Sequence, residues 1–509
     1  MKKKDVFICY AGNDKEVAWP LAQALEKRHL NVWIDKDSVR PGESLEVAIR
    51  KGLSECRYGV VILSKSFFEK HWPLHELSQL LDYEATGNEV IIPVWNGITE
   101  GEIARYSTKL ANRAALNIAS GIEQIAEDVA NRTKQRRISL KPIVTFGSGN
   151  GELILTTSSE VELGAKHQVG FKEFFGGSAV NHSLRLLKAG YPVLPVLSIG
   201  NDRIGHSIQK MIHEAALTIG VPDDVDEFIQ DSHFFAKGIN TPTSVVVVQE
   251  GRRTIFSQSL PGADRFLDYL DSRISDVLDA TEPCGGPGAI IIGHIYGDAP
   301  TQGQLGGMCT RKILDAFQGI CPVYANFGNT QIGLGLDHWK DVLKRIDTFQ
   351  LNILEARRFM TSTDDRKTLS EILSWFAENE ISTVITLDRF GAVATHKDGN
   401  EAYYFAWPAI ERQQIIDTTG AGDAFAAGMV AELSGKSWNS ANFSSALETA
   451  RVWAALACMN YGASEQCPDL STVMAYKRDA AKRKSFRAIE VQTARIAEQF
   501  IELIDLAYR

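Results

Sequence analysis

Short apolar runs alternate with amphipathic segments through the first quarter of the chain. The runs fall at DVFICY (5–10), NVWI (31–34), GVVILS (59–64) and EVIIPVW (89–95). Residues 13–29 and 42–55, which lie between the first three runs, carry apolar residues at helical spacing. Asn13 or Asp14 is suited to cap the first of these helices. Buried strands that alternate with helices predict a parallel sheet covered by helices on both faces.

A polar and basic segment, TKQRR (133–137), separates this pattern from a longer one. We therefore expect a first domain at 1–133, a linker at 134–141 and a second domain at 142–475. The second domain starts with the strand-rich stretches GELILTT and TSVVVVQEGRRTIFSQ, and continues with AIIIGHIY, CPVYANF, TFQLNIL and STVITLD between helical segments. This order predicts a three-layer α/β/α domain with a small β lid.

The last segment, 476–509, is predicted to be a helical tail. Its apolar residues fall on one face at helical spacing: Phe486, Ile489, Ile496, Phe500, Leu503 and Ala507. It begins with the basic run KRDAAKRK (477–484), which we interpret as a solvated helix face rather than a nucleic-acid contact.

Composition narrows the function classes. The chain has 509 residues, 44% hydrophobic and 23% charged, which is typical of globular protein with two to four domains. A net charge of −9 argues against a general nucleic-acid surface. The seven cysteines form no C-x-x-C pair, so neither a disulfide framework nor a zinc site is indicated. We find no signal peptide and no apolar stretch of about 18 residues, so we expect a cytoplasmic protein without a membrane partner.

The stretch DTTGAGDAFAAG (417–428) points to phosphoryl transfer. Gly420, Ala421 and Gly422 would place backbone N–H groups at the start of a helix, where unpaired donors and the helix dipole attract an anion. Asp423 follows at once, and a carboxylate there accepts the proton of an attacking hydroxyl. The helix is predicted to end at Gly435. Taken alone, the stretch is equally consistent with a turn that only packs a helix on a strand.

Other motifs occur in an order that resembles the PfkB-type carbohydrate kinases, the ribokinase family, across nearly all of 142–475. They are DTTGAGD (417–423), the run from Gly176 to Gly205 with its double glycine and Asn181, NILE (352–355) and TLDRFGA (386–392). The resemblance implies that Asp423 is the catalytic base and that 420–422 form the anion hole. It also implies ATP and Mg²⁺ as cofactors. It assigns the metal and phosphates to Asn352 and Glu355, the nucleotide to Thr386 and Gly391, and the substrate to Asn150, Glu152, Gly176, Gly177 and Asn181.

Three positions depart from that family's pattern. Glu152 stands where an Asp normally binds sugar hydroxyls, and the extra methylene shifts the carboxylate by about a bond length. Asp388 stands where relatives usually carry Gly, which places a negative side chain near the nucleotide phosphates. Asn326 stands where an Asp is common. These departures leave the identity of the substrate open.

The first domain resembles a TIR domain over about residues 4–133. The resemblance rests on DVFICYAGND (5–14), WIDKDSVRPGESL (33–45), HWPLHEL (71–77) and IIPVW (91–95). It implies a flavodoxin-like fold with a parallel five-stranded sheet. In the NAD⁺-cleaving members of that family, a Glu follows a Trp or Cys on the helix after the third strand, and this position is Glu76. Tyr10 and Trp33 are candidates to stack on NAD⁺.

Cleavage of the nicotinamide–ribose bond builds positive charge on the sugar, so one fixed carboxylate suffices to stabilise the transition state. The favoured hypothesis is therefore an NAD⁺ hydrolase acting through Glu76. Its PfkB-like domain would supply self-association, or sensing of a sugar, nucleoside or nucleotide. The alternative is an ATP-dependent sugar or nucleoside kinase whose TIR domain is a non-catalytic assembly module. A third hypothesis makes both domains binding modules. The sequence leaves open the ligand, the trigger, the oligomer size and whether the product is linear or cyclic.

Overall fold

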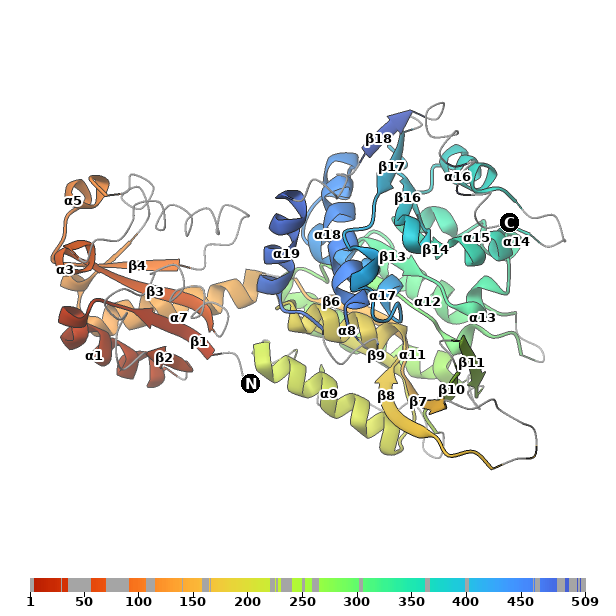
Figure 1. The fold of residues 1–509 in the computed structure, drawn as a ribbon, viewed down its shortest axis with the longest axis horizontal. Coiled ribbons are helices and arrows are strands. Elements are labelled where there is room, and N and C mark those ends of the chain that lie inside the picture. Colours follow the sequence, from red (N-terminus) through yellow and green to blue (C-terminus); the bar gives the residue numbers. More distant parts are fainter. Residues whose placement is uncertain are drawn as a thin grey trace. The chain divides into compact units, whose positions relative to one another are not determined.

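The computed structural model divides the chain into two compact units, Met1–Ser139 and Leu140–Arg509, and each is described by itself (Figure 1). No helix among the described residues is long and apolar enough to cross a membrane. The structure describes all residues except 1–3, 29, 35–55, 70–90, 107–114, 140, 158–163, 165, 220–224, 226–227, 230–239, 250–251, 259–264, 302–304, 362–366, 399–401, 461, 463–466, 483–489, 494–500, 502–503 and 505–509.

The first unit is built on a five-stranded sheet in the order β2-β1-β3-β4-β5, and every neighbouring pair is parallel. This order confirms the predicted sheet. The elements are β1 (Lys4–Cys9), α1 (Lys15–Glu26), β2 (Val32–Ile34), β3 (Cys56–Ser64), α3 (Lys65–Glu69), β4 (Ile91–Asn96), α5 (Glu100–Ala104), β5 (Leu116–Asn117) and α7 (Ile122–Ser139), with short 3₁₀ turns at Gly12–Asp14 and Ile118–Ser120.

The strands of this unit are apolar on both faces because each face packs on a different set of residues. Val6 and Ile8 of β1 join the core cluster that includes residues of α1 and α7. Their neighbours Phe7 and Cys9 join a second cluster with residues of α3 and α5. Successive side chains of a strand point to opposite faces, so both faces of the sheet are buried.

The second unit contains a nine-stranded sheet in the order β18-β17-β16-β15-β14-β13-β12-β6-β9 and a four-stranded sheet in the order β11-β10-β7-β8. The smaller sheet is the predicted β lid. The lid strands are β7 (Asn150–Thr157), β8 (Gly170–Gly176), β10 (Thr243–Gln249) and β11 (Arg252–Ser257). The main strands are β6 (Ile143–Ser148), β9 (Val193–Ser198), β12 (Ala289–Ile292), β13 (Val323–Asn326), β14 (Thr348–Asn352), β15 (Thr383–Thr386), β16 (Ala392–Thr395), β17 (Ala402–Ala406) and β18 (Glu490–Thr493).

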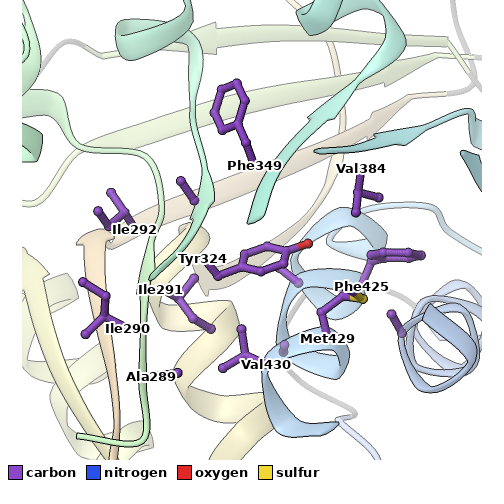
Figure 2. Close-up of a cluster of buried hydrophobic side chains, with 14 of the residues drawn as sticks. Ala289, Ile290, Ile291, Ile292, Tyr324, Phe349, Val384, Phe425, Met429 and Val430 are labelled. Atoms are coloured by element: carbon purple, nitrogen blue, oxygen red, sulfur yellow. The ribbon is translucent and has the colours of Figure 1, made fainter. Parts of the chain in front are cut away.

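Helices cover both faces of the main sheet, as two adjacent residues of β14 demonstrate. Phe349 packs its ring against Phe359 and Phe376 on one face. Gln350, the next residue, donates to the Gly422 carbonyl on the other face. Figure 2 shows part of the apolar core, with Phe349 on the first face and Phe425, Met429 and Val430 of α17 on the second. The helices are α8 (Ser178–Lys188), α9 (Arg203–Ile219), α11 (Phe266–Thr281), α12 (Met308–Phe317), α13 (Asn329–Ile332), α14 (Leu336–Trp339), α15 (Ile353–Met360), α16 (Leu369–Glu378), α17 (Ala421–Leu433), α18 (Ser440–Cys458) and α19 (Leu470–Lys482).

Two expected segments take a different form in the structure. The segment expected as a linker is helical as far as Ser139, since it continues α7. The tail is not helical throughout, because β18 pairs antiparallel with β17 and extends the main sheet. Of the helical face expected in the tail, the named residues lie outside the described part of the chain, whereas the adjacent Ile501 and Ile504 are helical and buried.

Candidate functional site

One edge of the main sheet in the second unit collects polar residues from five strands. Strands β6, β12, β13, β14 and β15 are parallel neighbours, so their carboxyl ends meet at the same edge. Ser148, Asn326, Asn352 and Thr386 end four of these strands. His294 follows the fifth, β12, by two residues. Ligands of open α/β sheets bind at this kind of edge, so these residues mark the candidate site.

Asp423 stands in the first turn of α17 beside this edge. Gly420 precedes the helix with φ +73°, a left-handed conformation that favours glycine. The Asn181 side-chain amide of α8 donates to Asp423 Oδ2 at 2.7 Å. His182 Nε2 lies 3.5 Å from Asp423 Oδ1. The Asp423 side chain is 18% exposed, so α8 holds the carboxylate while an opening to solvent remains.

The loop before Asp423 is fixed by two buried groups. Asp417 accepts from the backbone amide and hydroxyl of Thr419 and from the Gly462 amide. On the other side of the loop, the Tyr324 hydroxyl donates to Gln350, which in turn donates to the Gly422 carbonyl. Tyr324 extends from β13 toward α17 within the apolar cluster (Figure 2). These bonds orient the Gly420–Gly422 segment. The Ala421 amide donates to the Thr418 carbonyl at 3.2 Å, so the Gly422 and Asp423 amides are the first-turn candidates to bind an anion.

Two acceptor oxygens without partners converge at the double glycine. Asn150 Oδ1 and Asn181 Oδ1 are buried and make no hydrogen bond within the described chain. A Cβ on Gly176 would lie 3.7 Å from Asn150 Oδ1 and 3.4 Å from Asn181 Oδ1. Gly177 has φ +102°, and a Cβ there would lie 2.4 Å from the Ser148 carbonyl oxygen. A buried acceptor needs a donor, which an ordered water or a ligand hydroxyl supplies, so the surroundings of Gly176 suit a ligand with hydroxyl groups.

Glu152 lies on lid strand β7, and the segment after β12 brings Tyr296 near it. Burial raises the pKa of the Tyr296 phenol, and the Glu152 carboxylate raises it further. The Tyr296 and His294 ring centroids are 4.4 Å apart. Burial lowers the pKa of His294 to about 4, so its ring is neutral at pH 7, and Nε2 lies 2.8 Å from the Thr330 hydroxyl. No sequence pattern signals His294 or Tyr296, because only the fold brings Tyr296 near Glu152 and His294 next to Tyr296.

Asn352 and Glu355 form a reciprocal capping box at the start of α15. The Asn352 amide donates to Glu355 Oε2, and the Glu355 amide donates to Asn352 Oδ1, both at 2.8 Å. The pair therefore has a structural role as a helix cap, and the spacing N-x-x-E is typical of that role too. Burial raises the pKa of Glu355, and the Asp423 carboxylate raises it further, so the two carboxylates are close.

These two carboxylates are a chemically suitable set for Mg²⁺. That ion binds through one or two carboxylates together with substrate phosphates and water, rather than through an all-protein cage. Consistent with this, the described residues contain no group of three or more His, Cys, Asp or Glu side chains that would hold a metal by themselves. Glu355 Oε1 takes no part in the capping box and is the candidate ligand.

Thr386 and Gly391 flank a tight turn next to Asn352. Thr386 pairs with Asn352 across β14 and β15. Gly391 has φ +88°, and a Cβ there would lie 2.1 Å from the Ala406 carbonyl oxygen. Asp388 also has a positive φ, +49°. This left-handed backbone explains why Gly is common at the Asp388 position, and Asp is among the residues that tolerate it.

In the first unit, the structure describes two of the three expected site residues. Tyr10 follows β1 and is 3% exposed within the core cluster. Trp33 of β2 is half-buried, with its ring centroid 5.0 Å from that of Phe7. Glu76 lies outside the described residues. The structure therefore places the expected residues of the second unit, whereas the expected catalytic residue of the first unit is not among the described residues.

A buried carboxylate that the sequence suggested only as a helix cap organises the same edge of the first sheet. Asp14 is the N-cap residue of α1, but its side chain makes no capping bond. Instead, Ser64 at the end of β3 donates to Asp14 Oδ2 at 2.6 Å, and Asn96 at the end of β4 donates to Oδ1 at 2.9 Å. Asp14 thus links the carboxyl ends of β1, β3 and β4. In a sheet of this order, the point between β1 and β3 is where ligands bind.

Comparison with known families assigns both units. Residues 6–126 match the TIR domain, and residues 316–470 match the pfkB family carbohydrate kinases. NAD(+) hydrolase TcpA from Theionarchaea archaeon is 42% identical over 135 residues, covering 26% of this chain and 41% of that protein. The 2′ cyclic ADP-D-ribose synthase AbTIR from Acinetobacter baumannii is 40% identical over 129 residues, covering 25% and 48%. The chain thus spans less than half the length of these relatives.

The second unit has the ribokinase fold. The structure of ribokinase from Giardia lamblia superposes with a TM-score of 0.51 and 16% identity, covering 68% of this chain and 99% of that one. At this identity the likeness concerns the fold alone. It agrees with the three-layer unit and β lid expected from the sequence.

Proposed function

Because the chain joins a TIR domain to a pfkB-type carbohydrate kinase domain, we propose that it is an NAD⁺ hydrolase regulated by its second domain. The observation that carries the proposal is the 42% identity of the first unit to a protein named as an NAD(+) hydrolase. The parallel sheet supports it, because the ends of β1 and β3 form the kind of switch point at which nucleotides bind.

Glu76 is the residue that we propose for catalysis. As nicotinamide leaves, positive charge builds on the ribose, and a fixed carboxylate nearby stabilises that transition state more than the ground state. Nicotinamide departs as a neutral molecule, so the reaction requires no strong general acid. In this proposal the half-buried Trp33 borders the nucleotide, whereas Tyr10, which is 3% exposed, packs in the core beneath it rather than stacking on it.

The test is nicotinamide release from NAD⁺ by the purified full-length protein, followed by chromatography. We expect Glu76→Ala to lower the rate by at least about a hundredfold, since it removes the main electrostatic stabilisation. Glu16→Ala is the matched control, because Glu16 is exposed on α1 of the same unit. Unchanged release by Glu76→Ala would disprove the assignment of Glu76. The absence of release by the wild type, at high protein concentration as well, would disprove the activity.

For the second unit we propose that a sugar, nucleoside or nucleotide binds between Glu152 and Asp423. The converging acceptors of Asn150 and Asn181 support a ligand with hydroxyl groups. Such a ligand regulates the first unit only if it binds one assembly state more tightly than another. Self-association is therefore part of the proposal. The biological role that we propose is anti-phage or immune-type defence through NAD⁺ depletion.

Regulation is tested by adding ribose, adenosine or ATP to the NAD⁺ assay while sedimentation is measured in parallel. We expect at least one of them to change the rate and the sedimentation coefficient together. The effect should disappear in Asn181→Ala, whose side chain contacts Asp423 in the second unit. A rate that none of the three compounds alters would exclude them as regulators.

The second candidate function is ATP-dependent phosphoryl transfer to a sugar or nucleoside hydroxyl. It is favoured by Asp423, which is held by α8 beside the first turn of α17 and close to Glu355. In this function Asp423 accepts the hydroxyl proton, Gly420–Gly422 bind the phosphoryl oxygens, and Thr386 and Gly391 border the nucleotide. When bound, Mg²⁺ would neutralise charge on the phosphates, and Glu355 would hold it.

ATP consumption screened over sugars and nucleosides tests this candidate. Asp423→Asn should lower any transfer by about a hundredfold or more, because it removes the proton acceptor. Asp279→Asn, at an exposed position of α11, is the matched control. Transfer that survives Asp423→Asn would show that another group acts as the base.

A further inference from the structure

A histidine that the fold places against the proposed base has no assigned role. His182 follows Asn181 on α8, and both side chains approach the same carboxylate from one helix. Asn181 binds Asp423 Oδ2, and His182 Nε2 faces Oδ1 at 3.5 Å. The two oxygens of Asp423 are thus approached by two successive residues.

His182 is completely buried, and neither of its ring nitrogens makes a hydrogen bond within the described chain. A buried polar ring without a partner is costly, so its orientation calls for an explanation. The charged groups that act on it are Asp423 and Arg185. Burial lowers the pKa of His182, the Arg185 guanidinium lowers it further, and Asp423 raises it, with a net decrease.

A neutral imidazole carries one N–H, and the carboxylate decides which nitrogen has it. Nε2 faces Oδ1, so an N–H on Nε2 is attracted to the carboxylate, whereas a lone pair there is repelled. A distance of 3.5 Å is longer than an ordinary N–H···O bond. Contacts around catalytic groups are often long in the unliganded protein and shorten when substrate binds.

We propose that His182 is a positioning residue that donates Nε2–H to Asp423 Oδ1. With Asn181 on Oδ2, both oxygens of the carboxylate then have a donor from α8, and its orientation is set before a ligand arrives. Each oxygen still has a lone pair for a substrate hydroxyl. The neighbouring residues Ala421 and Gly422 offer little side chain to pack against Asp423, and the nearby Glu355 carboxylate repels it. The donors from α8 oppose both effects. This inference rests on the second candidate function, in which Asp423 is the base.

The proton position can be measured without any enzymatic activity. Full-length protein labelled with ¹⁵N in the histidine rings is examined by long-range ¹H–¹⁵N correlation at pH 7.5, and the His182 signals are those lost in His182→Gln. We expect a protonated Nε2 and a bare Nδ1, and we expect Asp423→Asn to shift these signals. A bare Nε2 would overturn the inference.

Kinetics separate positioning from a merely structural role. The side-chain amide nitrogen of Gln falls close to the place of Nε2, that of Asn falls close to Nδ1, and Met fills a similar volume without a donor. On an accepted substrate we expect His182→Met and His182→Asn to lose about tenfold or more in kcat with little change in KM, since a shifted base reacts slowly. His182→Gln should restore most of the rate. Equal rates for Gln, Asn and wild type would also overturn the inference. If the wild type transfers no phosphoryl group, the second candidate function fails, and the spectrum still decides the role of His182.

Discussion

The two units differ in the hydrogen bonding of the buried polar groups near the carboxyl ends of their strands. In the TIR unit, the buried Asp14 carboxylate accepts from Ser64 and Asn96, so both of its oxygens are used by the protein. In the kinase unit, the Oδ1 atoms of Asn150 and Asn181 are buried beside Gly176 with no partner in the described chain. Because unsatisfied buried acceptors destabilise a fold, their presence points to a ligand. A satisfied network, by contrast, stabilises the fold by itself.

The largest effect should come from removing the satisfied carboxylate. Asp14→Ala removes the carboxylate that accepts from the buried Ser64 hydroxyl and from the half-buried Asn96 amide, and leaves Ser64 only its neighbour Ser66 as an alternative acceptor, so we expect the TIR unit to lose about 3 to 4 kcal/mol of unfolding free energy. Urea denaturation of the full chain measures this, with Asp128→Ala on α7 as the control. A loss below about 1 kcal/mol would show that the network contributes little, and the contrast between the units would fail.

A somewhat smaller effect, dependent on pH, is expected at Asp298 in the kinase unit. Asp298 is buried and accepts from the amide and hydroxyl of Thr310, yet burial raises its pKa to about 6, above the ordinary value of 3.8. Between pH 4 and 6 the folded protein therefore retains a proton that the unfolded chain loses. Unfolding free energy falls as pH rises through this window, by about 3 kcal/mol in total.

Asp298→Asn removes this titration. The urea midpoint of the transition that responds to the substitution should therefore decrease less between pH 4.5 and pH 7 than it does in the wild type. Parallel pH curves for the two proteins would show that Asp298 keeps an ordinary pKa and that its network resembles that of Asp14 more closely than we infer.

The smallest effect on stability, and the most specific one, is expected at Asn150. Its Oδ1 has no partner to lose, so Asn150→Ala should change the unfolding free energy by less than about 1 kcal/mol. Binding should weaken by about tenfold, because a hydroxyl of the ligand loses its acceptor. Calorimetry with ribose and adenosine measures the affinity. A large loss of stability with unchanged affinity would make Asn150 a scaffold residue and remove the difference between the two edges.

The strands of both units could be predicted from sequence because buried parallel strands are continuous apolar runs. The short polar strand β18 could not be, since EVQT has no such run and depends on β17 for its partner. In the kinase unit, the glycine motif and Asp423 were recognisable because helix starts have a local signature. His294 and Tyr296 have none, since only the fold brings the segment after β12 near Glu152 of the lid, where Tyr296 lies.

Some local sequence motifs are consistent with two different roles for the same residues. The spacing of Asn352 and Glu355 fits both a capping box and a phosphate site, and the structure shows the first of these directly. Asp14 shows the reverse case, because it occupies the N-cap position while its side chain serves distant strands. A sequence pattern predicts the place of such a residue better than it predicts the partner, since the partner comes from another part of the chain.

Strand β18 has a practical consequence for anyone who shortens this protein. Its four residues, Glu490–Thr493, pair along β17, whose opposite side is already bonded to β16. Deleting everything after Lys482 would strip β17 of that neighbour and leave its outer peptide groups open to strand addition by a second molecule. Truncated versions should consequently precipitate more readily than the intact polypeptide, whatever happens to either proposed site.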